Sequence, residues 1–263
     1  MTDPHYGLPA VALGPASMPL LGFGTSPLSD EDVTAAVATA LETGYRHLDT
    51  ATAYGNEAGI GRALAASGLP ASEVFLTTKL PPDHAGRARQ TLEQSLTLLG
   101  VDHVDLWLVH WPPDGAAAPA LWEEFARARQ DGLATGIGVS NYSLAQIDEL
   151  STATGVTPEV DQVRWGPVLY DVGLATGLRE RGVVLEGYSP LKAVNLEDPT
   201  LRAVAEAHGT TAAQVVIAWH IAHGFVVIPN SGRPERIRSN AEGARVPLSV
   251  AEVASLDRLA TTG

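Results

Sequence analysis

From about residue 20 to its end, the sequence alternates short apolar runs with segments whose apolar residues recur at helical spacing. Eight such pairs can be counted, and glycines such as Gly44, Gly68 and Gly100 end the helical segments. Short apolar strands that alternate with helices are typical of a parallel sheet whose outer face is covered by the helices. Eight pairs in a chain of 263 residues therefore predict an α/β fold of the (β/α)8 TIM barrel type, which needs roughly 250 residues.

The pattern predicts where each element lies in one barrel domain that spans residues 1–263. A small N-terminal β-hairpin with a turn at Gly14-Pro15 is expected within residues 8–24. The expected barrel strands are residues 20–24, 45–49, 74–79, 104–110, 134–139, 160–163, 183–188 and 225–228. The expected helices are residues 30–43, 60–67, 85–99, 119–130, 144–150, 168–181, 211–223, 234–241 and 249–259.

An open doubly wound sheet is the alternative fold. Such a sheet usually has fewer strands and a glycine-rich first turn with the pattern G-x-G-x-x-G. Pro27 takes the place of the third glycine in the turn that begins at Gly22, and Leu64 does so in the segment that begins at Gly59. The sequence therefore favours the barrel.

The composition narrows the classes of function. A formal net charge of −13 disfavours nucleic-acid binding, which needs clustered Lys and Arg to neutralise phosphates. The sequence contains no run of about 18 apolar residues that would predict a membrane span, and no basic and apolar leader is visible. The absence of cysteine removes thiolate nucleophiles and Cys-based metal sites. A cytoplasmic protein without a nucleic-acid or membrane partner is expected.

Four polar residues fall near the carboxyl ends of three consecutive expected strands. Asp49 ends one strand and Tyr54 lies in the loop after it, while Lys79 and His110 end the next two strands. Active sites of barrels of this type lie at that end of the strands. Taken singly, Asp49 can cap a turn, Tyr54 and His110 can pack, and Lys79 can extend into solvent. Their joint placement on one rim favours a catalytic site.

The four groups together suit the reduction of a carbonyl group. A phenol has an unperturbed pKa of about 10, and the ammonium of Lys79 would lower it by stabilising the phenolate of Tyr54. Asp49 would hold that ammonium, and the imidazole of His110 would orient a carbonyl oxygen. Because no side chain supplies a hydride, a nicotinamide cofactor is implied.

These residues resemble the catalytic tetrad of the aldo-keto reductase family. The histidine stands in Val109-His110-Trp111-Pro112, and further motifs occur in the family's order over nearly the whole chain. Each motif is a weak signal alone, but the set is specific, and it is similar to short prokaryotic members of the 2,5-diketo-gluconate reductase kind. The further motifs are Gly22-Phe23-Gly24-Thr25, Gly138-Val139-Ser140-Asn141-Tyr142, Asp161-Gln162-Val163, Tyr188-Ser189-Pro190-Leu191 and Ile228-Pro229-Asn230-Ser231.

The resemblance implies a barrel that reduces aldehydes and ketones to alcohols by hydride transfer from NAD(P)H, usually NADPH. Tyr54 would be the general acid, with Lys79 and Asp49 tuning it. A small carbonyl compound is the expected substrate, and a monomer is the expected assembly. The residues that the resemblance assigns to the cofactor are Gly24, Thr25, Ser140, Asn141, Gln162, Tyr188, Ser189, Leu191, Asn230, Ser231, Gly232, Arg233, Arg236 and Asn240.

Part of this set would hold the nicotinamide. By the resemblance, Ser140, Asn141 and Gln162 would hydrogen-bond its carboxamide, and Tyr188 would stack on its ring. Ser189 and Leu191 would lie along the diphosphate. The alternative is that Ser140 and Asn141 cap a helix and that Tyr188 only packs.

The sequence departs from the family pattern at the site for the cofactor's 2′-phosphate. The family usually has Ile-Pro-Lys-Ser followed by an arginine. Here Ser231 and Arg236 match, but Asn230 replaces the lysine. Loss of a cation weakens the preference for a phosphorylated cofactor, although Arg233 can compensate. NADPH is therefore the expected cofactor, with NADH possible.

The segments around the expected substrate site also differ from the family pattern. The stretch from Gln162 to Pro167 departs from the usual sequence, and the segment after Leu191 is brief. An open site for small aldehydes and diketones is therefore expected, and its expected rim is Leu28, Trp111 and Trp165.

Three other functions remain open at this point. A glycosidase needs two carboxylates across a cleft, for which Asp49, Asp161 and Glu186 are candidates, but it leaves the other tetrad residues unexplained. A metal hydrolase is disfavoured because His220 and His223 lack the HExxH pattern, and no metal is expected. A non-catalytic nucleotide-binding partner subunit on the same fold is the third alternative, and the intact tetrad argues against it.

Overall fold

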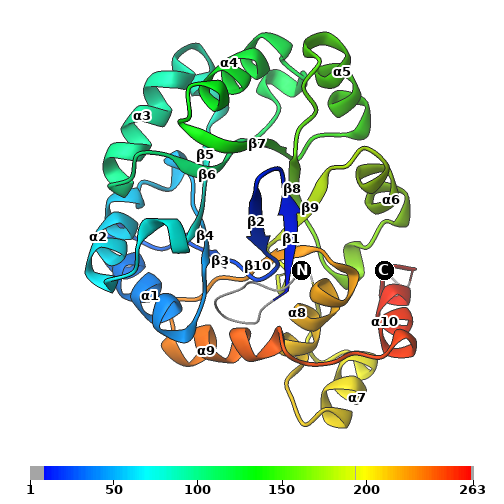
Figure 1. The fold of residues 1–263 in the computed structure, drawn as a ribbon. Helices are drawn as coiled ribbons and strands as arrows, with labels where there is room; N and C mark the ends of the chain where they lie inside the picture. Colours follow the sequence, from blue (N-terminus) through cyan, green and yellow to red (C-terminus); the bar gives the residue numbers. More distant parts are fainter. Residues whose placement is uncertain (1–8, 193, 262–263) are drawn as a thin grey trace.

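A computed structural model of the chain describes residues 9–192 and 194–261. Within these residues, eight parallel strands run in the order β10-β9-β8-β7-β6-β5-β4-β3 and are surrounded by helices (Figure 1). The predicted TIM barrel is confirmed, although both ends of the expected domain, residues 1–8 and 262–263, lie outside the described ranges. The strands are β3 (Phe23–Gly24), β4 (His47–Asp49), β5 (Phe75–Leu80), β6 (Val104–Val109), β7 (Ala134–Ser140), β8 (Val160–Arg164), β9 (Val184–Tyr188) and β10 (Val226–Ile228).

Backbone hydrogen bonds between the two ends of the sheet close the barrel. Leu21, which lies just before β3, forms a parallel bridge with Val227 of β10. The Gly22 amide donates to the Val227 carbonyl at 2.9 Å, and the Val227 amide donates to the Leu20 carbonyl at 2.7 Å. Each strand from β3 to β10 therefore has a neighbour on both sides, as a barrel requires.

Polar side chains cap the starts of several of the outer helices. Ser29 accepts a hydrogen bond from the Asp32 amide at the start of α1, and Ser143, Thr211 and Ser249 form capping boxes. The helices are α1 (Asp30–Thr43), α2 (Glu57–Ser67), α3 (Ala88–Leu99), α4 (Pro119–Gln130), α5 (Leu144–Thr154), α6 (Val172–Glu180), α7 (Pro199–Ala207), α8 (Ala212–His223), α9 (Pro234–Gly243) and α10 (Val250–Asp257). Short 3-10 turns are η1 (Thr52–Tyr54), η2 (Ala71–Glu73), η3 (Pro82–Arg87), η4 (Pro113–Gly115), η5 (Pro167–Leu169) and η6 (Arg258–Thr261).

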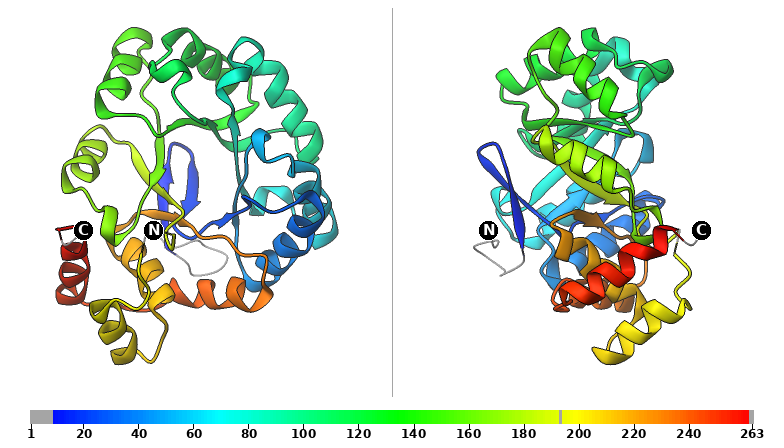
Figure 2. Two further views of the ribbon diagram at one scale, coloured as in Figure 1. Left: turned by 180° about the vertical axis from the view of Figure 1, so that it is seen from behind. Right: turned by 90° about the vertical axis from the view of Figure 1, so that its right-hand side faces the viewer.

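The predicted hairpin consists of β1 (Ala10–Leu13) and β2 (Ala16–Pro19). It lies across one opening of the barrel in Figure 1, and the side view in Figure 2 shows it at that end of the molecule. Met18 is buried against the interior residues Leu106 and Leu108. Since the chain enters β3 directly from this hairpin, the hairpin covers the amino-terminal ends of the strands and leaves the opposite end for a site.

The first barrel strand and the helix expected at residues 168–181 are shorter than predicted. β3 contains two residues in place of the expected five, because Leu20 bonds to Pro9 beside the hairpin and Leu21 and Gly22 pair with Val227 of β10 in one short bridge. The expected helix begins only at Val172 as α6. Asp171 accepts hydrogen bonds from two amides in the first turn and so fixes that start.

Helix α7 was not predicted from the sequence. Its start nevertheless carries two familiar signals, because Asp198 caps the first turn and Pro199 occupies the first helical position. The helix buries Leu201, Val204 and Ala205 and lies against α8 at the lower edge of Figure 1. The unit after β9 therefore contains two helices where the pattern indicated one.

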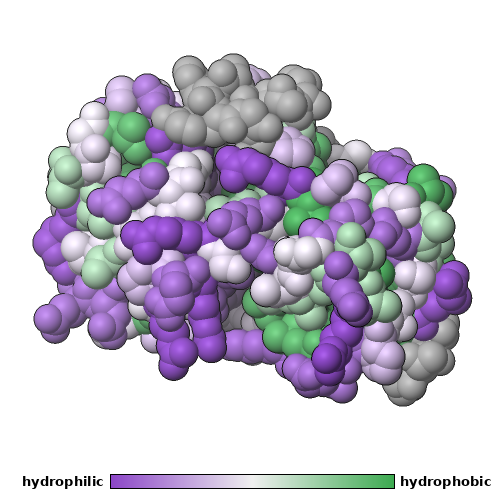
Figure 3. Space-filling model, turned by 90° about the horizontal axis from the view of Figure 1, so that it is seen from below, coloured by the Kyte–Doolittle hydropathy of each residue, from purple (hydrophilic) through white to green (hydrophobic). Residues whose placement is uncertain are grey.

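The face of the molecule that carries α9 is mainly polar, since hydrophilic residues cover most of it (Figure 3). Among the described helices, none combines the length and the apolar composition that crossing a membrane requires. Trp111 is a large exposed apolar residue: its side chain follows β6 at the open end of the barrel and is 48% exposed.

Close packing between β7 and its neighbours depends on Gly138. A Cβ atom at this position would lie 2.6 Å from the carbonyl oxygen of Val160 on β8 and 2.7 Å from Leu108 on β6. The carbonyl oxygen of Val160 belongs to the backbone of β8, so it can move only if the hydrogen-bonded strands shift relative to each other. Gly138 thus sets the position of the end of β7, where Ser140 lies.

We predict that Gly138→Ala lowers the free energy of unfolding by about 1–3 kcal/mol, because the added methyl group overpacks the barrel wall. Urea denaturation followed by circular dichroism measures this change. Gly86→Ala is the matched control, since a Cβ atom there meets nothing within 4 Å, and its stability should stay equal or rise slightly. Equal stability of the two variants would contradict the close approach described here.

Candidate active site

The four predicted polar residues meet at the carboxyl ends of the strands. Asp49 ends β4, Lys79 lies near the end of β5, and His110 directly follows β6. Tyr54 ends η1, the turn after β4. Because neighbouring strands are parallel and in register, their ends project to the same rim. The structure therefore brings together the residues that the sequence placed there.

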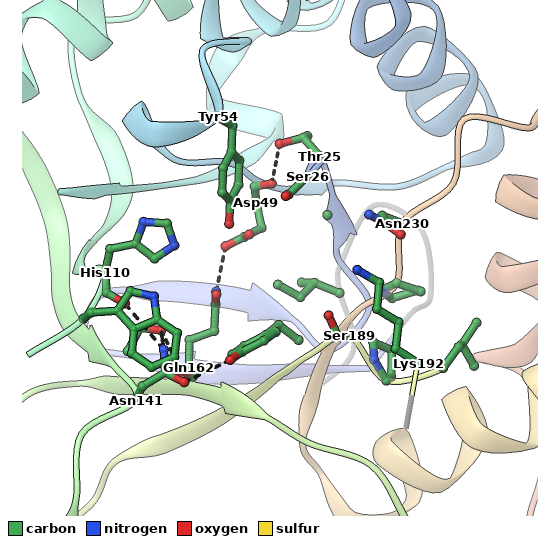
Figure 4. A pocket seen from close by; sticks show the side chains of 18 residues that line it. Thr25, Ser26, Asp49, Tyr54, His110, Asn141, Gln162, Ser189, Lys192 and Asn230 are labelled. Carbon is green, nitrogen blue, oxygen red and sulfur yellow. Dashed lines mark hydrogen bonds between the residues drawn. The ribbon is translucent and has the colours of Figure 1, made fainter. Parts of the chain in front are cut away.

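A cleft with a volume of about 210 Å³ opens at this rim (Figure 4). Thirteen of the residues predicted from the sequence line it, and Lys79 lies buried beneath Asp49. Those thirteen are Gly24, Thr25, Asp49, Tyr54, His110, Trp111, Ser140, Asn141, Gln162, Tyr188, Ser189, Leu191 and Asn230.

Lys79 and Asp49 form a buried ion pair. The Nζ atom of Lys79 donates to Oδ1 of Asp49 at 2.6 Å and to the carbonyl of Thr50 at 2.8 Å. Burial alone would lower the pKa of Lys79, but Asp49, Tyr54 and Glu186 outweigh burial and raise it above its usual range. Lys79 is therefore a cation at any physiological pH, and Asp49 holds it in place.

The phenol of Tyr54 lies between Lys79 and His110. The Lys79 Nζ atom is 5.2 Å from the centroid of the Tyr54 ring, and the rings of Tyr54 and His110 meet edge to face at 5.6 Å. Burial raises the pKa of Tyr54, the Lys79 charge opposes that change, and the Asp49 charge adds to it. Lys79 therefore acts on the pKa of Tyr54 in the predicted direction, but burial outweighs it and the pKa lies above its usual value. Tyr54 is accordingly protonated and able to act as an acid.

His110 is neutral at physiological pH. Burial, and then the Lys79 charge, lower its pKa to about 3. A neutral imidazole offers one N–H donor and one acceptor nitrogen. His110 can therefore donate a hydrogen bond to a carbonyl oxygen in the cleft without carrying a charge of its own.

Gln162 joins two buried carboxyl groups. Its Nε2 atom donates to Oδ2 of Asp49 at 2.8 Å and to Oε2 of Glu186 at 2.9 Å. Burial, and then the Asp49 charge, raise the pKa of Glu186 to about 8, so this carboxyl group is mainly protonated at neutral pH. His47 lies on the other side of Glu186, with Nε2 3.6 Å from Oε1, and burial lowers its pKa to about 3. The Lys79–Asp49 pair is thus surrounded by neutral groups.

A second hydrogen-bond chain fixes the side chains at the ends of β7 and β9. The Ser140 hydroxyl donates to the carbonyl of Gln162 at 2.7 Å, the amide of Asn141 donates to that hydroxyl at 2.8 Å, and the Tyr188 hydroxyl donates to Oδ1 of Asn141 at 3.1 Å. Asn141 and Ser189 have φ angles of 63° and 52°. Two non-glycine residues in the left-handed region at one site indicate a functional constraint on the loops.

A second hollow lies beside the cleft and shares Asn230 with it. Arg233 and Arg236 line this hollow, and so do the carboxylates of Glu31 and Asp32 at the start of α1. The remaining lining residues are Leu28, Ala35, Ser231 and Gly232. The predicted phosphate-binding residues therefore gather here, next to two acidic residues that the sequence reasoning did not include.

Two of the three expected rim residues lie elsewhere. Trp165 is 2% exposed and packs edge to face on Tyr170 and Phe225, so its indole faces the core under η5 and not the cleft. Leu28 lines the hollow beside α1 and does not line the cleft. The prediction for Trp165 is wrong because its indole is buried among aromatic side chains. Leu28 lies beside the cleft, and its contact with a substrate stays a prediction. Trp111 does line the cleft.

Asn240 lies outside both hollows. It is 7% exposed on α9, the helix that also carries Arg236. Among the residues that line the cleft or the second hollow, Asn240 does not occur. Its contact with the cofactor stays a prediction.

Glu186 and Lys192 belong to the site but were not assigned to it from the sequence. Glu186 was considered only as a possible glycosidase carboxylate, although its position two residues before Tyr188 on a strand places both side chains on the same face. Lys192 follows the Tyr188-Ser189-Pro190-Leu191 motif directly and lines the cleft. The sequence signal that could have identified Lys192 is the rarity of lysine in this chain.

The geometry disfavours the glycosidase and metal-site alternatives. Asp161 and Glu186 are both 0% exposed, so they do not face each other across an open cleft, as glycosidase carboxylates must. Within residues 9–192 and 194–261, no group of three or more His, Asp and Glu side chains is arranged to hold a metal ion. His220 is buried and its Nδ1 atom donates to the carbonyl of Val216 at 2.7 Å.

Comparison with known protein sequences identifies one family. The model of the Aldo/keto reductase family matches residues 20–261. An aldo-keto reductase of Mycolicibacterium smegmatis is 41% identical over 98% of this chain and 94% of its own length. The morphine 6-dehydrogenase of Pseudomonas putida is 40% identical over 93% of this chain and 88% of its own length.

Solved structures show the same likeness. An aldo/keto reductase from Brucella melitensis superposes with a TM-score of 0.88 and 36% identity, and the match covers 96% of this chain and 99% of that one. A Bombyx mori aldo-keto reductase in complex with NADP superposes with a TM-score of 0.87 and 30% identity, covering 96% of this chain and 92% of that one.

We predict that Glu186→Gln reduces the loss of stability at alkaline pH. The ordinary pKa of glutamate is about 4.3, and in the folded protein that of Glu186 is about 8. The unfolded chain therefore releases this proton first, so the stabilising contribution is full below about pH 4 and is lost as the pH rises through 8. Urea unfolding from about pH 5 to about pH 9 should show a smaller decline for the variant.

The exposed residue Glu149 on α5 supplies the matched control. Glu149→Gln should follow the wild-type profile. If Glu186→Gln declines with pH as steeply as the wild type and the control, the raised pKa of Glu186 is disproved.

Proposed function

Because the chain belongs to the aldo/keto reductase family, it reduces carbonyl compounds, and we propose that it does so with Tyr54 as the proton donor and NADPH as the preferred cofactor. The observation that carries the proposal is the place of the Tyr54 phenol, which lines the cleft beside the buried cation of Lys79 and the neutral ring of His110. These three groups supply an acid, a charge that stabilises its conjugate base and a donor for the carbonyl oxygen.

The described residues fit a nicotinamide cofactor. Tyr188 is half-buried and lines the cleft, so its ring can support a planar group. Gln162 already uses its Nε2 atom on two carboxyl groups, which leaves Oε1 as an acceptor for a carboxamide N–H group. Ser140 and Asn141 lie in the same wall of the cleft. When bound, the reduced cofactor supplies the hydride that no side chain can provide.

The side chains account for the proton. As the carbonyl carbon is reduced, negative charge develops on its oxygen, and the N–H group of His110 stabilises that charge. The Tyr54 hydroxyl then transfers its proton to this oxygen and leaves a phenolate. The ammonium of Lys79 stabilises the phenolate, while Asp49 keeps the ammonium in place. Water returns a proton to Tyr54 before the next turnover.

The residues of the second hollow support a moderate preference for NADPH over NADH. Arg233 and Arg236 line it and offer cations to a 2′-phosphate. Asn230 brings no charge, and the carboxylates of Glu31 and Asp32 line the same hollow and repel a phosphate. The two arginines attract the 2′-phosphate, and the two carboxylates oppose that attraction. NADH, which lacks this phosphate, therefore stays usable as a second cofactor.

Small aldehydes and ketones are the proposed substrates. Trp111 lines the cleft at its mouth with a side chain that is 48% exposed, so it can cover a substrate without closing the site. The relative from Pseudomonas putida is named for its action on morphine, which shows that a protein this similar accepts a bulky alcohol. No observation favours a non-catalytic partner subunit. A cytoplasmic monomer remains part of the proposal.

We predict that Tyr54→Phe keeps cofactor binding but lowers kcat for reduction of a small aldehyde by about 100- to 10,000-fold, because the general acid is lost. Consumption of NADPH measured by absorbance gives kcat, and quenching of tryptophan fluorescence gives the Kd of NADPH. Tyr170→Phe is the control, since Tyr170 packs on Trp165 and Trp219 away from the cleft. Near-normal turnover in Tyr54→Phe would rule out Tyr54 as the acid.

We predict that the wild-type protein has a higher kcat/KM with NADPH than with NADH. Asn230→Lys should raise this ratio by about 10- to 100-fold, because a charged hydrogen bond to the 2′-phosphate contributes about 1.5–3 kcal/mol. Steady-state kinetics with both cofactors measure the ratio. The control is Arg238→Ala, since Arg238 lines a different hollow with Glu42 and Arg245. A clear wild-type preference for NADH would contradict the proposal.

A further inference from the structure

Three hydroxyl groups are linked to the buried carboxyl group of Glu57, to which the mechanism above gives no task. Glu57 is the first residue of α2 and is 2% exposed. The Thr78 hydroxyl donates to its Oε1 atom at 2.7 Å, and the Ser95 hydroxyl donates to its Oε2 atom at 3.0 Å. The Thr52 hydroxyl lies 3.2 Å from that of Ser95. A buried carboxyl group costs free energy unless its oxygen atoms are hydrogen-bonded, and here both are.

These four side chains, the Glu57 network, come from four different elements. Thr52 begins η1, the turn that ends at Tyr54. Thr78 lies on β5, Ser95 lies on α3, and Glu57 itself begins α2. The network therefore ties the turn that carries the phenol to the strand that carries the buried cation.

On the side of β5, Glu57 holds the residue next to Lys79. Successive side chains of a strand point to opposite faces of the sheet. Lys79 points into the barrel, where its Nζ atom contacts Asp49 at 2.6 Å, and Thr78 points outward to Glu57. The carboxyl group of Glu57 therefore fixes β5 from outside at the level from which the ammonium projects inward.

On the side of η1, the network fixes the start of a turn that contains three residues. The Tyr54 amide donates to the Ala51 carbonyl at 3.0 Å, and the Gly55 amide donates to the Thr52 carbonyl at 3.2 Å. Ala51 precedes the turn and has no polar side chain to cap it. In so short a turn, the position of Thr52 determines the position of Tyr54, and Ser95 holds the hydroxyl of Thr52.

The neighbouring residue Asn56 has a different role. Its Nδ2 atom donates to the carbonyls of Thr25 and Leu28 at 3.2 and 3.0 Å, and its Oδ1 atom accepts from the Thr50 hydroxyl at 3.1 Å. These bonds fix the loop after β3 and the end of β4. Of the two buried polar residues that follow Tyr54, Glu57 is thus the one that connects η1 to β5.

We propose that Glu57 is a positioning residue that sets the distance between the Tyr54 phenol and the Lys79 ammonium. It does so by tying η1 to β5 through the three hydroxyl groups. The proposal rests on the function proposed above, in which Tyr54 donates the proton. The distance matters because the attraction between the ammonium and a phenolate weakens with separation, and because a misplacement of about 1 Å can cost about 100-fold in rate.

Two variants of Glu57 test the role of its hydrogen bonds. Glu57→Met keeps the length of the side chain but removes both bonds, so kcat for reduction of a small aldehyde should fall by about 10- to 100-fold. Glu57→Gln should stay within about threefold of the wild type, because its amide oxygen accepts from one hydroxyl and its NH2 group donates to the other.

Steady-state kinetics give kcat and KM, and titration with NADPH by quenching of tryptophan fluorescence gives the Kd and the number of binding sites. With kcat expressed per binding site, a loss of folded protein does not lower it. The Kd of NADPH and the KM of the aldehyde should stay near their wild-type values, because Glu57 acts on the proton donor alone. Wild-type kcat in Glu57→Met would overturn the proposal, and so would a loss in Glu57→Gln as large as that in Glu57→Met.

Variants on the η1 side of the network keep the test decisive if Glu57→Met does not fold. Ser95→Ala and Thr52→Val should each lower kcat by about tenfold, and Thr52→Ser, which keeps the hydroxyl, should restore it. The matched control is Thr91→Val. Thr91 is buried four residues earlier on α3, and its hydroxyl donates to the carbonyl of Arg87 at 3.0 Å, outside the network. Its kcat should equal that of the wild type.

A double variant separates positioning of the phenol from a general structural role. If Ser95 acts only through Tyr54, then Ser95→Ala has no further effect on kcat once Tyr54→Phe has removed the phenol hydroxyl. An additional loss as large as that caused by Ser95→Ala alone would overturn the proposal.

The outcomes distinguish this inference from the proposed function. Near-normal turnover in Tyr54→Phe means that the proposed function fails at its proton donor. If Tyr54→Phe is slow while Ser95→Ala, Thr52→Val and any folded Glu57→Met turn over like the wild type, the proposed function stands and the role assigned to Glu57 is wrong.

Discussion

The buried ion pair between Lys79 and Asp49 is the interaction on which the site depends. Removing both charges from water costs several kcal/mol for each ion, and the 2.6 Å contact offsets this cost only together with the hydrogen bonds from Lys79 to Thr50 and from Gln162 to Asp49. Strands β4 and β5 are adjacent and in parallel register. The barrel wall therefore holds the two partners together, and loss of either one would leave an unpaired charge in the interior.

The groups around this pair are neutral at physiological pH, which makes the Lys79 charge effective. Burial raises the pKa of Glu186 to about 8 and lowers those of His47 and His110 to about 3. A cation in such surroundings is poorly screened and acts strongly on a nearby developing charge. In the mechanism proposed above, that charge develops on Tyr54 during reduction. The residues behind the cleft would then act on catalysis through the charge state of the interior.

The sequence predicted the strand ends well and the loops less well. Asp49, Lys79 and His110 were placed correctly because apolar periodicity marks where each strand stops, and parallel strands end at one rim. Trp165 was misplaced because the residue after a strand end follows its own side-chain packing, here against Phe225. Helix α7 was missed for a similar reason, since its short apolar pattern did not stand out between two longer units.

By itself, the sequence determined the alternating barrel, the residues at the strand ends and the family, because these follow from local patterns and motif order. The tertiary structure decided which groups are charged and which side chains reach the cleft. Gln162 contacts Asp49 across 113 residues of chain, and no local pattern reports that contact or the burial that keeps Glu186 protonated. Only closure of the barrel brings these residues together and removes water from them.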